Sequence, residues 1–291
     1  MPLDYTYTDS GNSQAQVIVV SQYSAISGSL TAKAWDGNVG GFIPLLCSGK
    51  ATIDGSIIAN GTGFRGGSIN SNSTGNQGES TLGAGVQSIT ANGIGGGGGE
   101  FIGTASPACG GGGGYATAGA DAPDNVAGAT NRGGDGGSTI GIPDLTTIMF
   151  GGGGGAGGDK NEGGGQSGGG GNGGGIIMIF ATIITITGSI GNNGNAGING
   201  AGGGNKTGGG GGAGGSVFLK GQIVTLGALL TTTTGGAGGT GINNDSQTGG
   251  VGGDGRIRVE TCSLTGTSNP SANESVGGHS FCAVGGGIFS E

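Results

Sequence analysis

The sequence predicts an all-β protein in which repeated strand pairs, forming a β-solenoid or a β-sandwich, combine with a packed bundle of polyglycine-II-like helices. Glycine makes up 84 of the 291 residues, apolar β-branched runs recur between glycine blocks, and one long tract has glycine at every third position. Essentially no α-helix is expected. No apolar period of 3.6 residues is sustained, and glycine costs a helix about 1 kcal/mol per residue against alanine.

Composition narrows the classes of function. Hydrophobic residues make up 32% of the chain and aromatic residues 4%, which predicts a thin core rather than a conventional one. Charged residues make up only 9%, although disordered chains of low hydrophobicity generally carry high net charge. The net charge of −8 argues against nucleic acid or an anionic membrane as a partner, because both attract clustered lysine and arginine.

Neither a membrane span nor a secretion signal is predicted. The longest apolar run, residues 176–186, is shorter than the roughly 20 residues that cross a bilayer, and it has the composition of a strand. The N-terminal residues lack a basic segment followed by an apolar stretch, so a Sec signal is not expected. If Met1 is the natural start, the chain is made, and even assembled, inside a cell.

Three regions are expected along the chain. Residues 1–27 form an N-terminal strand or arm that serves as an assembly contact, residues 28–260 form a glycine-rich repeat domain, and residues 261–291 form a C-terminal tail. Each copy of the repeat opens on a Gly-Gly pair and passes through two apolar runs to Gly-Ser-Ile or a similar triplet. The first three copies open at Gly40-Gly41, Gly174-Gly175 and Gly214-Gly215 and reach the triplet at Gly55, Gly188 and Gly227.

Each copy predicts two short strands, because its runs are rich in β-branched residues. A shorter fourth copy runs from Gly253 to Gly266, and Ser29–Trp35 is expected to supply one more strand.

The tract from Gly188 to Gly203 has glycine at every third residue, which is the period of an extended helix with three residues per turn. Collagen shares the period but needs abundant proline, and the whole chain has six prolines. Buried backbone groups must find partners, so we expect such segments to bond laterally to one another. Flexible linkers are the alternative reading of these tracts.

The alternation of glycine blocks and strand pairs resembles the glycine-rich regions of bacterial surface and phage proteins. Its closest copies are Gly173–Gly203 and Gly209–Arg258, and the resemblance covers roughly residues 28–260. The glycine tracts also look like those of phage tail-fibre tip adhesins, which implies polyglycine-II helices packed in a sandwich with exposed loops that contact a host. A more distant likeness is to the glycine-rich extracellular domain of the anaplastic lymphoma kinase receptor family. The long strand pairs depart from the adhesin pattern, so a mixed architecture fits better than a pure polyglycine sandwich.

The four cysteines have no CxxC spacing, which argues against a metal site. Cys262 and Cys282 are candidates for a disulfide, worth about 3 kcal/mol for a loop of this length. Free buried thiols are the alternative.

Motifs with catalytic appearance are expected to arise by chance in so biased a sequence. Gly165–Gly169 matches GxSxG formally, and Gly200–Thr207 imitates a phosphate-binding loop but has Asn205 in place of its second glycine. Asp135 and Asp254 lie in Gly-Gly-Asp-Gly turns without the repeat that calcium sites of this kind require. We therefore expect no enzyme, no catalytic residues, no cofactor and no metal.

The predicted function is a structural surface protein: a virion-associated fibre, spike or decoration, or an adhesin subunit, located on a virion or an extracellular surface. Its partners would be further copies of itself, as a homo-oligomer or polymer, and a host-surface glycan or protein receptor. Asparagine-rich loops on a rigid scaffold suit such recognition, and they contain the candidate receptor or assembly residues Asn70, Asn72, Asn76, Asn243 and Asn244. The residues 231–234 are expected to form another exposed turn. The alternatives are an extracellular bacterial or archaeal filament subunit or cell-surface adhesin, and a lectin-like carbohydrate-binding module.

Overall fold

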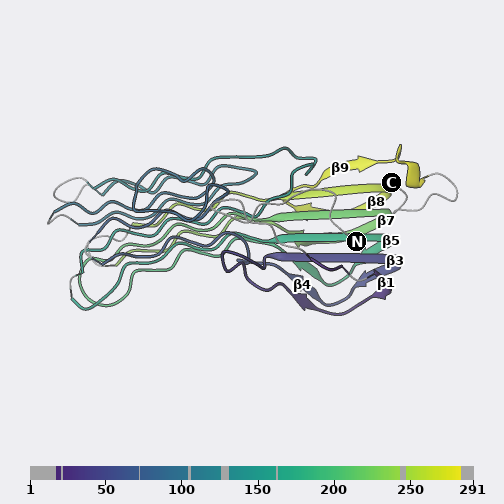
Figure 1. Ribbon diagram of the computed structural model, residues 1–291, viewed down its shortest axis with the longest axis horizontal. Helices are drawn as coiled ribbons and strands as arrows, with labels where there is room; N and C mark the ends of the chain where they lie inside the picture. The colour runs from purple at the N-terminus through teal and green to yellow at the C-terminus, as the bar shows by residue number, and fades with distance from the viewer. Residues whose placement is uncertain are drawn as a thin grey trace, which may run out of the picture.

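The computed structural model describes residues 18–20, 22–71, 73–103, 106–125, 131–161, 163–242 and 247–282. The molecule is elongated, with a β-sheet at one end and long irregular segments running to the other (Figure 1). Within the described residues there are nine strands, one 3₁₀ turn and no α-helix, so the expectation of an all-β protein is confirmed. These elements are β1 (Gln22–Ile26), β2 (Leu30–Thr31), β3 (Phe42–Ile53), β4 (Ser56–Ile58), β5 (Ile176–Ile186), β6 (Ser189–Gly191), β7 (Ser216–Thr232), β8 (Arg256–Asn269), β9 (Asn273–Val276) and η2 (Ser280–Cys282).

All strands pair in parallel within one curled sheet. The order is β1-β3-β5-β7-β6-β4-β2, and β8 joins β7 and carries β9 on its other side. The residues that follow the three Gly-Gly pairs are aligned across the sheet, since Phe42 pairs with Ile176 and Ile176 with Ser216. Ser216 pairs in turn with Arg256, the first residue of β8.

Parallel pairing requires the chain to return to the same end of the sheet before each new strand. The short strands β4 and β6 and the last part of β7 provide that return. After β6, for example, Asn192 Nδ2 already lies 2.9 Å from the carbonyl oxygen of Gly175 just before β5, and the glycine-rich segment then leaves the sheet and comes back.

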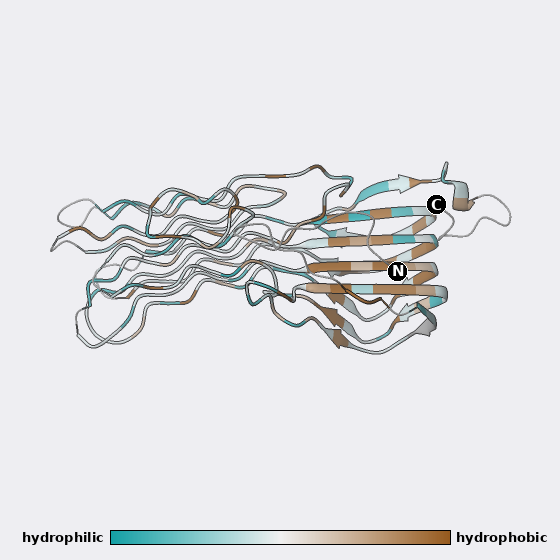
Figure 2. Cartoon of the chain, viewed as in Figure 1, coloured by the Kyte–Doolittle hydropathy of each residue, from teal (hydrophilic) through white to brown (hydrophobic). Residues whose placement is uncertain are grey.

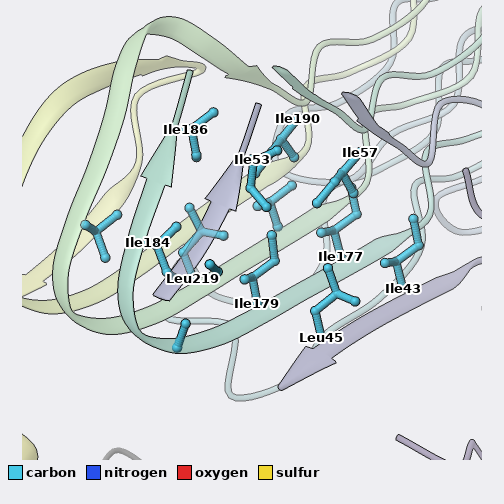
Figure 3. Packing of buried hydrophobic residues seen from close by; sticks show 14 of the residues in the cluster. Ile43, Leu45, Ile53, Ile57, Ile177, Ile179, Ile184, Ile186, Ile190 and Leu219 are labelled. Carbon is cyan, nitrogen blue, oxygen red and sulfur yellow. The ribbon is translucent and has the colours of Figure 1, made fainter. Parts of the chain in front are cut away.

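The apolar core lies inside the curl of the sheet. Long strands such as β3 alternate buried and half-buried residues, and the buried face points inward. Ile179 on β5 is fully buried between its neighbours Leu45 and Leu219, and Ile57 and Ile190 approach from the short strands (Figure 3). Apolar residues concentrate at this end of the molecule, whereas the glycine-rich end is nearly neutral in hydropathy (Figure 2).

Three details of the strands differ from the sequence expectation. The two short strands expected in each copy are joined, so that both apolar runs lie in one long strand, β3, β5 or β7. Ser29–Trp35 supplies only the short β2. In the third copy, the triplet at Gly227 is not aligned with that at Gly188. Ile190 pairs with Thr231, because β7 is irregular near Gly227 and Leu229, which both have positive φ. The expected boundary between residues 260 and 261 falls within β8.

The glycine-rich segments are neither helix nor strand, yet their backbone groups are bonded laterally in a regular pattern. Segment 151–159 donates to three neighbouring segments in rotation, and every third N–H group reaches the same neighbour. In chain order, the nine acceptors are the carbonyls of Gly174, Gly114, Glu79, Gly171, Gly111, Asn76, Gly168, Ala108 and Ser73. Carbonyls of the same segment accept from Gly210 and Ala213, from Gly96 and Gly99, and from Gly67. Segment 151–159 is thus surrounded by other segments.

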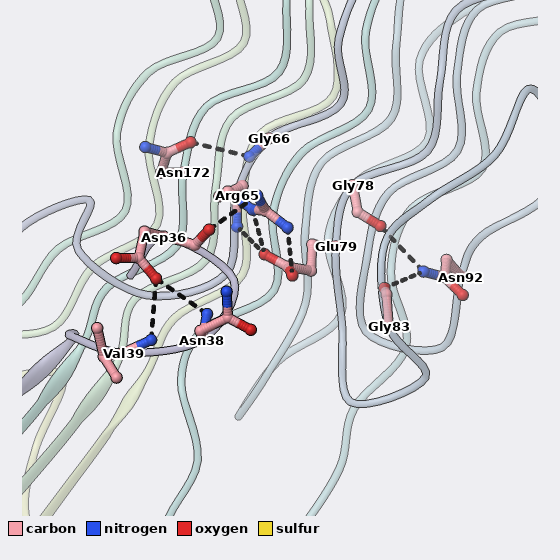
Figure 4. Close-up of polar contacts among 10 residues, drawn as sticks. All are labelled: Asp36, Asn38, Val39, Arg65, Gly66, Gly78, Glu79, Gly83, Asn92 and Asn172. Carbon is pink, nitrogen blue, oxygen red and sulfur yellow. Dashed lines mark hydrogen bonds and ion pairs between the residues drawn. The ribbon is translucent and has the colours of Figure 1, made fainter. Parts of the chain in front are cut away.

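Close approach explains why these positions are glycine. At Gly154, Gly170 and Gly210, an added Cβ atom would lie within 3.0 Å of a backbone carbonyl of the adjacent segment. Polar side chains add further hydrogen bonds and ion pairs to the lateral backbone bonding of the glycine-rich segments. Arg65 forms a two-pronged ion pair with Glu79, with Nη2 2.9 Å from Oε1, and donates to the Asp36 carbonyl at 3.1 Å (Figure 4).

A second, smaller cluster joins the glycine segments to the sheet. Fully buried Tyr115 packs with Leu145 and Ala213, and its hydroxyl lies 2.7 Å from Ser216 Oγ at the start of β7. Burial raises the pKa of the Tyr115 phenol, and the Ser216 hydrogen bond and the Arg256 charge offset part of that rise.

Because the folded pKa of Tyr115 is raised, its contribution to stability is present below the ordinary phenol pKa of about 10 and is lost as pH rises through the folded value. We expect one of the four tyrosines to ionise at higher pH than the others in a phenolate absorbance titration. The late step should be missing in Tyr115→Phe. A wild-type titration with a single step near pH 10 would contradict this.

A disulfide joins Cys262 on β8 to Cys282 in η2, with a Cα–Cα distance of 5.5 Å, and Cys47 and Cys109 are free and buried. The bridge ties β9 and η2 to the edge of the sheet across a sequence separation of 20 residues. We expect the double variant Cys262→Ser/Cys282→Ser to lose about 3 kcal/mol of unfolding free energy and to be trimmed by protease at the C-terminal end. Wild-type protein treated with reductant is the control and should behave like the variant. Equal stability with and without the bridge would refute the expectation.

Candidate functional site

The candidate site is the group of loops at the end of the molecule opposite the sheet, called here the distal loops. Their position follows from the path of the chain. Segment 151–158 leaves the sheet end, where the Phe150 ring packs at a tilt against Trp35. Segment 168–175 returns to begin β5, so the turn between the two segments is distal. The same logic places residues 201–207, between segments 192–200 and 208–215, at that end, together with the adjoining ends of segments 233–242 and 247–255 (Figure 1).

A row of backbone bridges holds the distal loops together. Asp159 pairs with Ser73 on one side and with Lys206 on the other, and Lys206 pairs with Ile242. Loops that are far apart in sequence therefore lie side by side. In particular, the loop containing Asn70 and Asn76 and the segment ending at Ile242 belong to one surface.

The structure describes two of the five candidate receptor residues, Asn70 and Asn76. Asn70 and Asn76 are half-buried and bonded to each other, with Asn70 Nδ2 2.9 Å from Asn76 Oδ1. Asn76 Nδ2 also donates to Ser68 Oγ at 2.7 Å. These amides shape their own loop, which leaves less of their hydrogen-bonding capacity for a ligand. Asn72, Asn243 and Asn244 lie outside the described residues.

The expectation of an exposed turn at residues 231–234 is wrong. Thr231 and Thr232 end β7, and Thr231 and Thr233 are fully buried. The run of threonines signals a strand and its continuation into a glycine segment, because β-branched residues favour extended backbone.

Residues of the two motifs with catalytic appearance are buried and engaged elsewhere. Ser167 is 4% exposed, and its hydroxyl donates to the Gly158 carbonyl at 2.7 Å. In the loop that imitates a phosphate site, Lys206 is fully buried and ion-paired with Asp159, and the Thr207 hydroxyl donates to the Gly158 carbonyl at 2.8 Å. Neither hydroxyl nor the ammonium faces a space where a substrate or a nucleotide phosphate would bind.

The ion pair between Lys206 and Asp159 is the residue pair that sequence reasoning missed. Lys206 Nζ lies 2.8 Å from Asp159 Oδ1, and both side chains are 0% exposed. In the sequence, Lys206 is a lone lysine inside a glycine-rich stretch. Nothing in that pattern distinguishes a buried lysine from one exposed to solvent. Only the tertiary structure brings the two residues together.

The remaining polar groups form no reactive cluster. Among the described residues, no group of three or more His, Cys, Asp or Glu side chains is placed to hold a metal ion. His279 stacks on Phe281 and lies 3.1 Å from the Ser275 carbonyl, and Asp254 accepts from the Gly235 N–H. A surface hollow of about 360 Å³ lies between β1, β2 and the curl of the sheet, and among its lining residues only Tyr23 carries a titratable side chain.

In the described part of the chain no helix has the length and apolar character needed to cross a membrane. No family model, no curated protein and no solved structure matches this chain.

Proposed function

We propose that the protein is a non-enzymatic structural subunit of a surface assembly, namely a virion-associated fibre, spike or decoration, or an adhesin. In this proposal the sheet is the base, the glycine segments form a stiff shaft, and the distal loops contact the outside. The burial of Ser167, Lys206 and Thr207 supports a non-enzymatic role, because the motif residues that most resemble catalytic ones are used for packing.

The observation that carries the proposal is the bonding around segment 151–159. Nine consecutive N–H groups serve three neighbours in strict rotation. A rotation of three is what an extended helix with three residues per turn would produce, so we interpret these segments as a bundle of polyglycine-II-like helices. We likewise interpret the aligned parallel strands as successive coils of a solenoid-like repeat, each interrupted by an excursion into the bundle.

Self-assembly would use the N-terminal edge of the sheet. Among the described residues, β1 pairs with β3 alone and β2 with β4 alone, so both present backbone groups on their outer side. Tyr23 and Leu30 are 47% and 43% exposed at this edge. At the opposite edge, β9 pairs with Arg258–Thr261 of β8, and the disulfide fastens η2 to β8. Among the described residues, the β1/β2 edge has no such covalent tie.

Hydrogen exchange on the intact assembly tests the rigid shaft. Amides of residues 151–158, 168–175 and 208–215 should exchange slowly, as amides of a cooperative core do. The exposed residues Thr81 and Ala84 should exchange fast and serve as the internal control. Rapid deuterium uptake throughout the glycine segments would mean that they are linkers and would remove the support for a scaffold.

Quantitative mass spectrometry of purified virions and of sheared surface filaments tests the location. Enrichment with virions at constant stoichiometry to other virion proteins supports the proposal. Recovery only with filaments selects the second candidate, a filament subunit or cell-surface adhesin.

A lectin-like module is the third candidate, and the polar distal loops favour it. Ser, Thr and Asn side chains near Asn70 and Asn76 suit hydrogen bonding to sugars. A broad glycan array should then give selective binding that is lost when the loop containing Asn70 is replaced. No binding on the array would leave the structural role as the better proposal.

A further inference from the structure

Asp159 and Lys206 form a buried pair that is poorly compensated as an ion pair. Lys206 Nζ has three N–H groups when charged, yet within the part of the chain that the structure describes it bonds only to Asp159 Oδ1, at 2.8 Å. The other carboxylate oxygen, Oδ2, is buried and has no partner among the same residues. Burying two charges is costly unless their remaining donors and acceptors are satisfied.

The two side chains are held face to face by backbone that cannot easily separate them. Asp159 and Lys206 are opposite residues of a backbone bridge, and each is bridged on its outer side as well, to Ser73 and to Ile242. Both side chains are 0% exposed, so bulk water does not compete for either group. A nucleophile and a carbonyl carbon fixed at such short range have a high effective concentration.

A backbone donor is placed on the oxygen that would become negative. The Asn161 N–H donates to Asp159 Oδ1 at 2.9 Å. Asn161 has a φ of 50°, a left-handed conformation that asparagine tolerates better than most residues, and it belongs to the tight turn after Asp159. This donor would stabilise charge developing on Oδ1 during attack at the carboxyl carbon.

We propose that Lys206 and Asp159 condense spontaneously to an intramolecular isopeptide bond that cross-links two distal loops. A proton passes from the Lys206 ammonium to the Asp159 carboxylate through the contact with Oδ1 and resides on Oδ2 in the resulting carboxylic acid, which leaves a neutral amine. Nζ then attacks Cγ, the C–N bond forms, and the electron pair of the C=O bond moves to Oδ1. The C–Oδ2 bond breaks, and Oδ2 leaves as water with its own proton and one from Nζ. The ammonium and the carboxylate thus become one secondary amide and one water molecule, and no other reactant is needed.

The amide would remove the unfavourable features of the pair. Two buried charges become none, the surplus N–H donors are lost, and the unpartnered oxygen leaves the protein. The bond would join the loop that contains Asp159 covalently to the loop that contains Lys206, at the backbone bridge that already pairs these two residues. This inference concerns covalent chemistry and does not depend on the proposed surface role.

Intact-mass spectrometry of the full-length, reduced protein tests the proposal. The wild-type mass should be lower than that of the sequence by one water molecule, about 18 Da. Trypsin should fail to cleave after Lys206, and tandem spectra should identify a branched peptide linked between Lys206 and Asp159. The branched peptide is decisive, because aspartate followed by glycine, as at Asp36 and Asp254, can also lose water without forming any cross-link.

Two matched variants complete the design. Lys206→Arg keeps the charge but cannot form the amide, so the branched peptide should vanish. Lys220→Arg changes a lysine that pairs with Glu260 at 3.9 Å and is 25% exposed, and it should keep the branched peptide. If Lys206→Arg does not fold, the wild-type protein still decides the question. A wild-type protein in which trypsin cleaves after Lys206 and releases the Asp159 peptide separately would overturn the proposal.

Discussion

Replacing Gly170 by alanine should lower the free energy of unfolding by about 1–3 kcal/mol, the usual cost of forcing an extra carbon into a packed interior. The added Cβ would lie within 3.0 Å of the backbone carbonyl of Gly154 in the adjacent segment. Backbone cannot turn aside as a flexible side chain can, so one segment must shift. The shift would strain bonds such as that from the Gly170 N–H to the Gly67 carbonyl, which is 2.9 Å long.

The adjacent residue provides the control. Gly169 is half-buried like Gly170 and belongs to the same segment, but an added Cβ there would lie 3.3 Å from the nearest atom, the Gly67 carbonyl oxygen. Alanine at a compatible glycine gains about 0.4–1 kcal/mol by restricting the unfolded chain, which should offset that mild crowding. Urea denaturation of both variants checks the pair. Equal effects at the two positions would show that the segments are not closely packed.

Ile179→Ala should lower the free energy of unfolding by about 2–5 kcal/mol. Ile179 is fully buried between β3 and β7, and the strands on the other side of the curl leave no solvent to fill the cavity. The buried apolar residues of the sheet are concentrated in one cluster, so a cavity at Ile179 weakens the packing on which the whole sheet depends.

Ile223→Ala on β7 is the matched control for the same chemical change. Ile223 is 46% exposed, and its replacement should cost no more than about 1 kcal/mol, the span of strand propensity. Urea denaturation measures the free energy of unfolding of both variants, and an unchanged m-value shows that a shift in midpoint is a change in stability. A loss at Ile179 as small as that at Ile223 would contradict the assigned core.

The sequence predicted where the long strands begin, because those signals are local, but the two short strands expected in each copy are one long strand in β3, β5 and β7. The apolar run at residues 176–186 has the bounds of β5, and the Gly-Gly pairs precede strands that the sheet aligns. The alignment of the third copy could not be predicted, since Gly227 resembles the earlier triplets. The irregularity of β7 at Leu229, where φ is positive, shifts the pairing to Thr231.

The distal site was predictable only in outline. Asparagine-rich loops were expected, and the path of the chain brings the segment near Asn70 and the segment ending at Ile242 to the same end. The pairing of Asp159 with Lys206 depends on contacts between segments separated by 47 residues, and no local pattern encodes it. The burial of Thr231 and Thr233 does not follow from their polar composition, because extended backbone beside the sheet places alternate residues inward.

The rotation of donors around segment 151–159 sets a rule for how this protein can change in length. Inserting one or two residues would turn every later N–H group toward the wrong neighbour, whereas inserting three would restore the phase. The neighbouring segments lie beside segment 151–159 and exchange backbone hydrogen bonds with it. Each of them must therefore lengthen by the same three residues if the added N–H and C=O groups are to be paired. Natural variants of such a shaft should therefore grow or shrink in units of three residues, with matched changes in several segments at once.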